Sequence, residues 1–195
     1  MIDNDGAYRS ENSNSRLAVQ DPPGLCLRVP DKRDGAQIHR LIEECPPLDL
    51  NSQYAYLLLC EHFSDTCVLA QAGDQVLGFI SAYEPPSRSD VLFVWQVAVH
   101  RQARGRGLGQ RMLRTLLQRP HLKHIQYIET TVSPENRASR SLFAALANAL
   151  QASIDELPLF DRHLFAGHGH DDEPLLRIGP FQASRVLART DCAAQ

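Results

Sequence analysis

The chain lacks the features that mark secreted, disulfide-stapled or membrane-spanning proteins. Its five cysteines are scattered and odd in number, and none forms a C-x-x-C pair, so the pattern indicates reduced thiols and not a disulfide framework. No apolar run approaches the roughly 18 residues that a membrane span needs. Residues 1–24 carry no apolar core, so we expect a disordered arm there and not a signal peptide.

The chain also lacks a strong excess of either charge. The formal net charge is -3 over 195 residues, which argues against nucleic-acid binding by the whole surface. Hydrophobic residues make up 43% and charged residues 22%, as is ordinary for a globular protein. We expect one cytoplasmic domain over 25–181 and a tail at 182–195, with neither a nucleic acid nor a membrane as partner.

Hydrophobic periodicity predicts a mixed α/β domain. Apolar and polar residues alternate in six segments that we expect to be strands, namely 25–30, 67–71, 76–83, 91–99, 125–132 and 175–181. Helical spacing predicts helices over 34–45, 50–63, 107–118 and 134–150, the last with Pro134 in its first turn. The three middle strands are separated by short turn-forming segments, which favours an antiparallel meander. The expected fold is therefore a mixed, mostly antiparallel twisted sheet flanked by helices.

A glycine-rich turn joins the strand at 91–99 to the helix that follows, in the sequence VAVHRQARGRGLGQRML over 97–113. Glycine costs backbone entropy on folding, so several in one turn serve a steric purpose. A strand that enters a helix through such a turn presents unpaired N–H groups at the positive end of the helix dipole. That geometry binds phosphate-like anions, and the arginines of the turn suit the same partner.

Several kinds of loop can carry such glycines. A P-loop requires a Lys-Ser or Lys-Thr pair, which is absent here, and the dinucleotide pattern G-x-G-x-x-G is met only in its first half by Gly105 and Gly107. Three antiparallel strands before the turn do not suit a doubly wound sheet. A plain basic loop remains an alternative. The pattern R-x-x-G-x-G of Arg104, Gly107 and Gly109 is that of a coenzyme A pyrophosphate loop.

With this pattern and this order of elements, the chain resembles the GNAT superfamily of N-acetyltransferases. The resemblance implies a GNAT fold, acetyl-CoA as co-substrate and no metal. Further along, Asn136, Ser139 and Phe143 match the family's N-x-x-A-x-x-x-Y pattern, with phenylalanine where the family often has a tyrosine general acid; no general acid is therefore assigned. The resemblance implies a cofactor site formed by Val97, Ala98, Val99, Arg104, Gly105, Arg106, Gly107, Leu108, Gly109, Gln110, Asn136, Ser139 and Phe143.

A narrower resemblance covers about residues 25–181. The segments 46–66, 92–99, 128–143 and 168–180 are similar to the diaminobutyrate acetyltransferases of ectoine biosynthesis. This resemblance implies transfer of acetyl to the γ-amine of L-2,4-diaminobutyrate by a homodimer. Two alternatives stay open: an acetyltransferase for another amine, such as a polyamine or a protein lysine, and a non-catalytic acyl-CoA-binding module, which the phenylalanine at 143 motivates.

Diaminobutyrate carries two ammonium groups and one carboxylate. An alkylammonium with a pKa near the lysine value of about 10.4 must lose a proton before it attacks. Within the segments of the narrower resemblance, the expected catalytic residues are Glu173, His170 and Glu129, and the expected substrate-binding residues are Asp49, Tyr54, Trp95, Thr130 and Thr131. Asp49 has a competing interpretation as a helix cap, and Trp95 one as a core residue.

A histidine group near the C-terminal end resembles a metal cluster. His163, His168 and His170 lie beside Asp171 and Asp172, and these residue types bind zinc. Loops of this composition are also commonly solvated, and acetyl transfer of the GNAT type needs no metal. We therefore expect no metal at this position.

Overall fold

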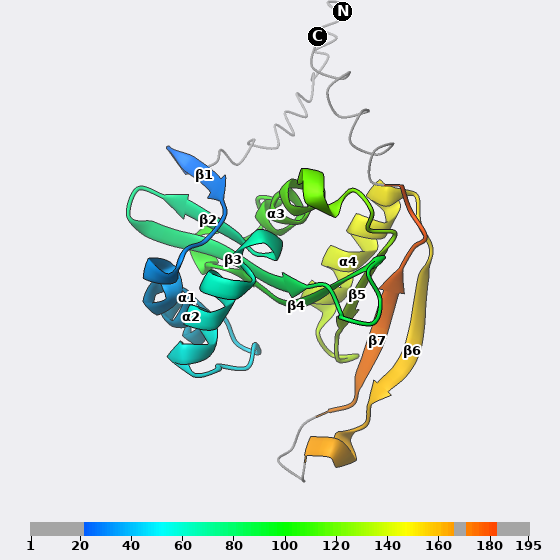
Figure 1. The fold of residues 1–195 in the computed structure, drawn as a ribbon. Coiled ribbons are helices and arrows are strands. Elements are labelled where there is room, and N and C mark those ends of the chain that lie inside the picture. Colours follow the sequence, from blue (N-terminus) through cyan, green and yellow to red (C-terminus); the bar gives the residue numbers. More distant parts are fainter. Residues whose placement is uncertain (1–21, 166–170, 183–195) are drawn as a thin grey trace, which may run out of the picture.

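Seven strands form one sheet in the order β1-β2-β3-β4-β5-β7-β6. The computed structural model describes residues 22–165 and 171–182. The strands are β1 Leu25–Arg28, β2 Val68–Ala72, β3 Gln75–Tyr83, β4 Val91–Val99, β5 Tyr127–Thr131, β6 Ile154–Phe160 and β7 Glu173–Ile178. The helices are α1 Gly35–Glu43, α2 Gln53–His62, α3 Leu108–Leu117 and α4 Arg137–Leu150 (Figure 1).

All neighbouring strands are antiparallel except β4 and β5, which run parallel. These two strands pair over a short register, from Val91 opposite Tyr127 to Phe93 opposite Glu129. Beyond Phe93, β4 continues to Val99 against β3 alone, while β5 stays paired with β7. The two central strands therefore diverge, and the predicted mixed, mostly antiparallel sheet is confirmed.

Helices cover both faces of the sheet (Figure 1). On one face α1 and α2 form a core with β3, in which Ile38, Tyr56 and Phe79 are fully buried. On the other face α3 and α4 pack over the central strands, with Met112 and Leu146 fully buried. The apolar spacing that predicted these helices thus corresponds to their buried faces.

The start of α4 differs from the expectation. The helix begins at Arg137 and not at Pro134, because the side chain of Asn136 caps it by accepting a hydrogen bond from the Ser139 N–H at 3.1 Å. An asparagine in this position satisfies one of the orphan donors of the first turn. Pro134 therefore lies before the helix, in the loop that follows β5.

The strand β6 was not expected. All seven of its residues are exposed, so it has no buried face to produce an apolar alternation, and it contains Pro158. It pairs antiparallel with β7 and forms the edge of the sheet on that side. The expected last strand is confirmed as β7, although it begins two residues earlier, at Glu173.

Three cysteines are buried in the α1–α2 core: Cys45, Cys60 and Cys67. Burial raises the pKa of the Cys60 thiol to about 12 and that of Cys67 to about 11, so both are inert protonated thiols near neutral pH. None of the helices within 22–165 and 171–182 is long and apolar enough to cross a membrane. The expected N-terminal arm and C-terminal tail fall almost entirely on residues outside these ranges.

Candidate active site

The divergence of β4 and β5 opens a cleft of about 990 Å³. Its walls come from the loop before α2, from β4 and β5, from the start of α4 and from the β6–β7 hairpin. Of the residues expected to act on or bind the acceptor or the coenzyme, those that line it are Asp49, Trp95, Val97, Glu129, Thr130, Thr131, Asn136, Ser139, Phe143 and Glu173. The cavity thus brings together six of the eight residues expected to act on or bind the acceptor, but only four of the thirteen expected to bind the coenzyme.

The glycines of the turn after β4 serve two steric purposes. Gly105 and Gly107 have φ angles of 74° and 71°, in the left-handed region that residues with a Cβ rarely adopt. Gly109 is different, because a Cβ on it would lie 3.1 Å from Leu142 of α4. The turn thus needs glycine to place Gly107 at the N-terminus of α3 and to let α3 approach α4 closely.

Two side chains fasten this turn. Arg104 Nε donates to the carbonyl of Val99 at 2.9 Å, and the Gln110 side-chain amide donates to the carbonyl of Leu142. Because α3 begins at Leu108, its first N–H groups have no partner within the helix. Residues 104–110 do not line the cleft itself; they lie at the far end of β4, where the predicted anion site would be.

The N-terminal half of α4 and its capping residue also contribute to the cleft. Asn136, Ser139 and Phe143 line the cavity together with Val97. Phe143 is only 2% exposed and is part of the α3–α4 core. Four of the residues expected to bind the coenzyme therefore line the cleft, and their role in binding it stays a prediction.

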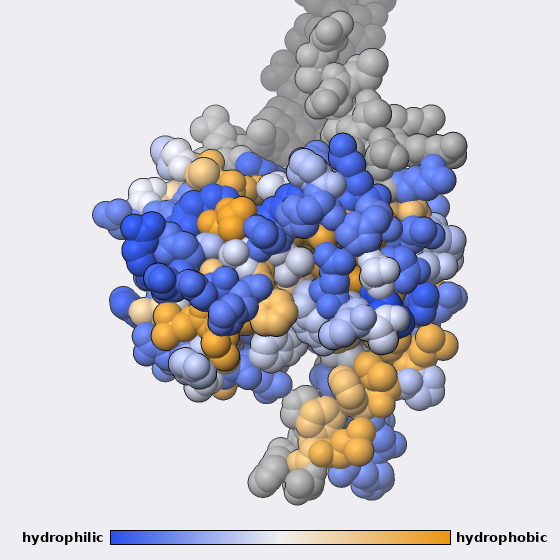
Figure 2. Space-filling view, viewed as in Figure 1, coloured by the Kyte–Doolittle hydropathy of each residue, from blue (hydrophilic) through white to orange (hydrophobic). Residues whose placement is uncertain are grey.

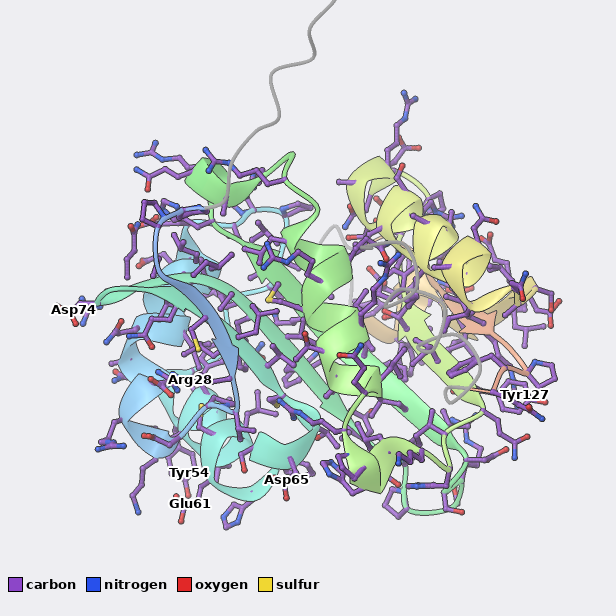
Figure 3. All side chains as sticks on the ribbon, turned by 90° about the horizontal axis from the view of Figure 1, so that it is seen from above. Arg28, Tyr54, Glu61, Asp65, Asp74 and Tyr127 are labelled. Carbon is purple, nitrogen blue, oxygen red and sulfur yellow. The ribbon has the colours of Figure 1, made fainter. Side chains whose placement is uncertain are left out.

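Some of the residues expected to bind the acceptor line the cleft, and others do not or are not described. Trp95 is 42% exposed at the cleft, so the interpretation as a core residue is excluded. Asp49 is not the cap of α2, because Ser52 takes that position and accepts from the Ala55 N–H at 3.3 Å. Tyr54 lies on α2 (Figure 3). It is 66% exposed and does not line the cleft, and His170 lies outside the described residues.

Glu129 lies at the centre of an ion cluster that sequence patterns did not predict. Its side chain is fully buried, and its Oε1 atom accepts from Arg88 at 2.6 Å and lies 3.2 Å from Nη1 of Arg177. The other oxygen, Oε2, is buried and has no hydrogen-bond partner among the described residues. The arginines are 41 and 48 positions away along the chain, so no local pattern indicates this cluster.

Gln96 is a second functional candidate that only the structure identifies. It is 4% exposed, and its Nε2 donates to the backbone carbonyl of Asp49 at 2.7 Å. Its Oε1 accepts from the Tyr56 hydroxyl at 3.4 Å, and that hydroxyl accepts from the Asn51 N–H at 3.2 Å. This network ties the loop that carries Asp49 to the floor of the cleft.

The described residues contain no group of three or more histidine, cysteine or acidic side chains arranged to hold a metal ion. His163 lies 3.8 Å from Asp161, and Asp172 is paired with Arg162 at 3.0 Å. The remaining members of the predicted histidine group, His168 and His170, lie outside the described residues.

Comparisons with known proteins agree with this geometry. The sequence matches the Acetyltransferase (GNAT) family over residues 35–147. It is 54% identical to the L-2,4-diaminobutyric acid acetyltransferase of Bordetella parapertussis over 176 residues, which are 88% of this chain and 95% of that protein. The protein of the same name from Methylotuvimicrobium alcaliphilum is 48% identical over 161 residues, 83% of this chain and 94% of the relative.

Among solved structures, the chain is similar to diaminobutyrate acetyltransferase EctA from Paenibacillus lautus in complex with L-2,4-diaminobutyric acid and coenzyme A. The two share 41% sequence identity and a TM-score of 0.78, over 80% of this chain and 95% of that one. More distant acetyltransferases, such as one from Thermus thermophilus at 14% identity and a TM-score of 0.56, share only the fold. This chain therefore belongs to the GNAT acetyltransferase family and, within it, to the L-2,4-diaminobutyric acid acetyltransferases.

Proposed function

We propose that this protein transfers the acetyl group of acetyl-CoA to the γ-amine of L-2,4-diaminobutyrate, yielding N-γ-acetyldiaminobutyrate for ectoine synthesis. The observation that carries the proposal is the cleft at the divergence of β4 and β5. It is lined by Asn136, Ser139 and Phe143 of the second family pattern, and also by the acidic residues Asp49 and Glu173. An acceptor with two ammonium groups suits such a wall, and the relatives bear the name of this activity.

We propose that the coenzyme enters along the free edge of β4. The N–H groups at the start of α3, after Gly107, would bind the pyrophosphate, because the positive end of a helix attracts anions. The pantetheine arm would pair with the backbone of Val97 and Val99, which β5 leaves uncovered. This placement directs the thioester toward Trp95 and the carboxylates of the cleft.

The reaction needs a base and a site for the oxyanion. We propose that Glu173 accepts a proton from the γ-ammonium, directly or through water, so that the amine nitrogen attacks the thioester carbonyl carbon. Backbone N–H groups near Val97 stabilise the tetrahedral oxyanion. Its collapse breaks the carbon–sulfur bond and releases the thiolate of coenzyme A. The second proton of the attacking nitrogen passes through water to this thiolate, which leaves a neutral amide, since Phe143 has no proton to give.

Glu129 is assigned a different role. Its Oε1 is held by two guanidinium groups, and its Oε2 is shielded from solvent. Glu129 is thus less accessible to an acceptor amine than Glu173, which is half-buried at the cleft. We therefore propose that Glu129 positions Arg88 and that Glu173 serves as the base.

A substrate panel tests the function. Coenzyme A release is measured with diaminobutyrate, with putrescine and with a lysine peptide. Turnover of diaminobutyrate at least 100-fold more efficient than that of the other two is expected. Turnover of another amine only would favour a different acetyltransferase, and coenzyme binding without any turnover would favour an acyl-CoA-binding module.

We propose that the enzyme is a homodimer that uses the β6 strand and the turn after it as its interface. Leu157, Leu159 and Phe160 are each 43% exposed, and Leu164 is 68% exposed. Figure 2 shows this apolar surface on the projecting β6–β7 hairpin, and patches of this kind mark protein contacts. Sedimentation analysis should give a dimer for the wild type and a monomer for a Leu157→Glu/Leu164→Glu variant.

We further propose that the enzyme acts in the cytoplasm. The buried cysteines are unpaired, as is usual for proteins that stay in a reducing compartment. Acetyl-CoA, the co-substrate implied by the family, would be supplied there. Cell fractionation with an antibody against the native protein tests this assignment; recovery in a secreted fraction would contradict it.

A further inference from the structure

The wall of the cleft contains a single cationic side chain among the described residues that line it. Four acidic residues line the cavity, Asp49, Glu129, Asp171 and Glu173, whereas Arg88 is the one arginine and no lysine is present. The proposed acceptor has two ammonium groups and one carboxylate. Its ammonium groups find several anions, but its carboxylate finds one guanidinium.

Arg88 is held in place by the backbone and by its side chain. It lies in the loop between β3 and β4, where its N–H donates to the carbonyl of Pro85 at 2.9 Å and its carbonyl accepts from the Val91 N–H at 3.3 Å. Its Nη1 donates to Oε1 of the fully buried Glu129 at 2.6 Å. A preorganised guanidinium loses less freedom when it binds a second carboxylate.

Glu129 does not cancel the charge of Arg88. The same carboxylate oxygen lies 3.2 Å from Nη1 of Arg177, whose guanidinium also lies over the Tyr127 ring at 4.0 Å from its centre. The cluster of Arg88, Arg177 and Glu129 therefore carries one net positive charge. The Arg88 side chain is 42% exposed and lines the cleft, so it has accessible surface left to bind a second anion.

The surroundings of Arg88 suit an α-carboxylate. Tyr83 and Phe93 line the same part of the cleft and are in ring contact, with centres 5.2 Å apart. Burial raises the pKa of Tyr83, so its hydroxyl stays a hydrogen-bond donor at neutral pH. An aromatic wall beside a guanidinium lowers the local polarity and strengthens its attraction for an anion.

We propose that Arg88 binds the α-carboxylate of the acceptor and makes the enzyme select an α-amino acid over a simple diamine. The inference rests on the proposed function, because it assigns one more residue to the same acceptor site. The proposal predicts that the Arg88 guanidinium and the substrate carboxylate act as a pair. Removal of either one should weaken acceptor binding by the same factor, and removal of both should weaken it little further.

The test compares diaminobutyrate with 1,3-diaminopropane, which has the same two amines without the carboxylate. For Arg88→Gln the KM for diaminobutyrate should rise about 10- to 100-fold, the effect of losing a charge-assisted hydrogen bond. For 1,3-diaminopropane, the KM as a substrate or the inhibition constant as a competitive inhibitor should stay within about twofold of the wild-type value. The KM of Arg88→Lys for diaminobutyrate should lie between those of the wild type and of Arg88→Gln, because a single ammonium cannot keep both the Glu129 contact and a bidentate carboxylate contact.

Arg33→Gln is the matched control, since Arg33 is 87% exposed and pairs only with its neighbour Asp31 within the described residues. Its kinetics should equal those of the wild type. Equal losses for both amines in Arg88→Gln, or an unchanged KM for diaminobutyrate, would overturn the assignment of Arg88. A wild-type enzyme that does not acetylate diaminobutyrate would instead overturn the proposed function, so the two failures are distinguishable.

Discussion

Replacement of Gln96 by leucine should loosen the acceptor side of the cleft without touching the coenzyme side. The substitution keeps a similar volume but removes the donor to the Asp49 carbonyl at 2.7 Å and the acceptor of the Tyr56 hydroxyl at 3.4 Å. Each buried polar group left without a partner costs about 1–3 kcal/mol. The two contacts together set an upper limit of about 6 kcal/mol.

The structure reduces that limit. Asp49 is exposed, so its carbonyl can regain a hydrogen bond from water. The Tyr56 hydroxyl keeps its bond from the Asn51 N–H. We therefore expect Gln96→Leu to lower the free energy of unfolding by about 2 kcal/mol, a substantial part of the 5–15 kcal/mol typical of a domain.

Urea unfolding measures the loss of stability, and steady-state kinetics measure the effect on acceptor binding. The KM for diaminobutyrate should rise, because the loop that carries Asp49 loses its anchor, while the KM for acetyl-CoA should stay the same. Tyr56→Phe provides a double-mutant cycle, with a coupling to Gln96 of about 0.5 kcal/mol in view of the long contact. An unfolding free energy within about 0.5 kcal/mol of the wild type, with unchanged KM values, would refute the reasoning.

Four further predictions concern the glycine turn, the two carboxylates, Phe143 and the buried cysteines. Gly107→Ala should weaken acetyl-CoA binding in calorimetry and cost about 1–2 kcal/mol of stability, because its φ is 71°; Gly73→Ala, with φ 56° in the β2–β3 turn, should show the stability loss alone. Glu173→Gln should lower kcat by about 10²–10⁴-fold, as expected for a lost base, whereas Glu129→Gln should mainly raise the KM for diaminobutyrate; the reverse pattern would exchange their roles. Phe143→Leu should leave the single-turnover rate within about tenfold, and a larger loss would reveal a role for the ring in the chemical step. Finally, Cys60 and Cys67, with pKa values raised to about 12 and 11, should react with a thiol reagent near pH 8 only after unfolding, and rapid labelling of the native protein would contradict their burial.

Local sequence determined most of the elements and the coenzyme turn. The apolar spacing along α1 and α3 and the alternation along β3 and β4 reflect burial of one face against the sheet, which is written into neighbouring residues. The glycines of the turn are also a local signal. Gly105 and Gly107 adopt a positive φ, which glycine tolerates because it has no Cβ. These local signals were sufficient to suggest the family.

The tertiary structure alone decided what the acceptor side of the cleft contains. Arg88, Glu129 and Arg177 meet because β4 pairs with β5 and β5 with β7, and no sequence spacing encodes that contact. The tertiary structure also placed Trp95 at the cleft and Tyr54 outside it, although both side chains are exposed. The strand β6 left no periodic trace because neither of its faces is buried in the single chain. Sequence patterns record contacts between neighbours and the burial of a face, whereas long-range pairing places distant charges together.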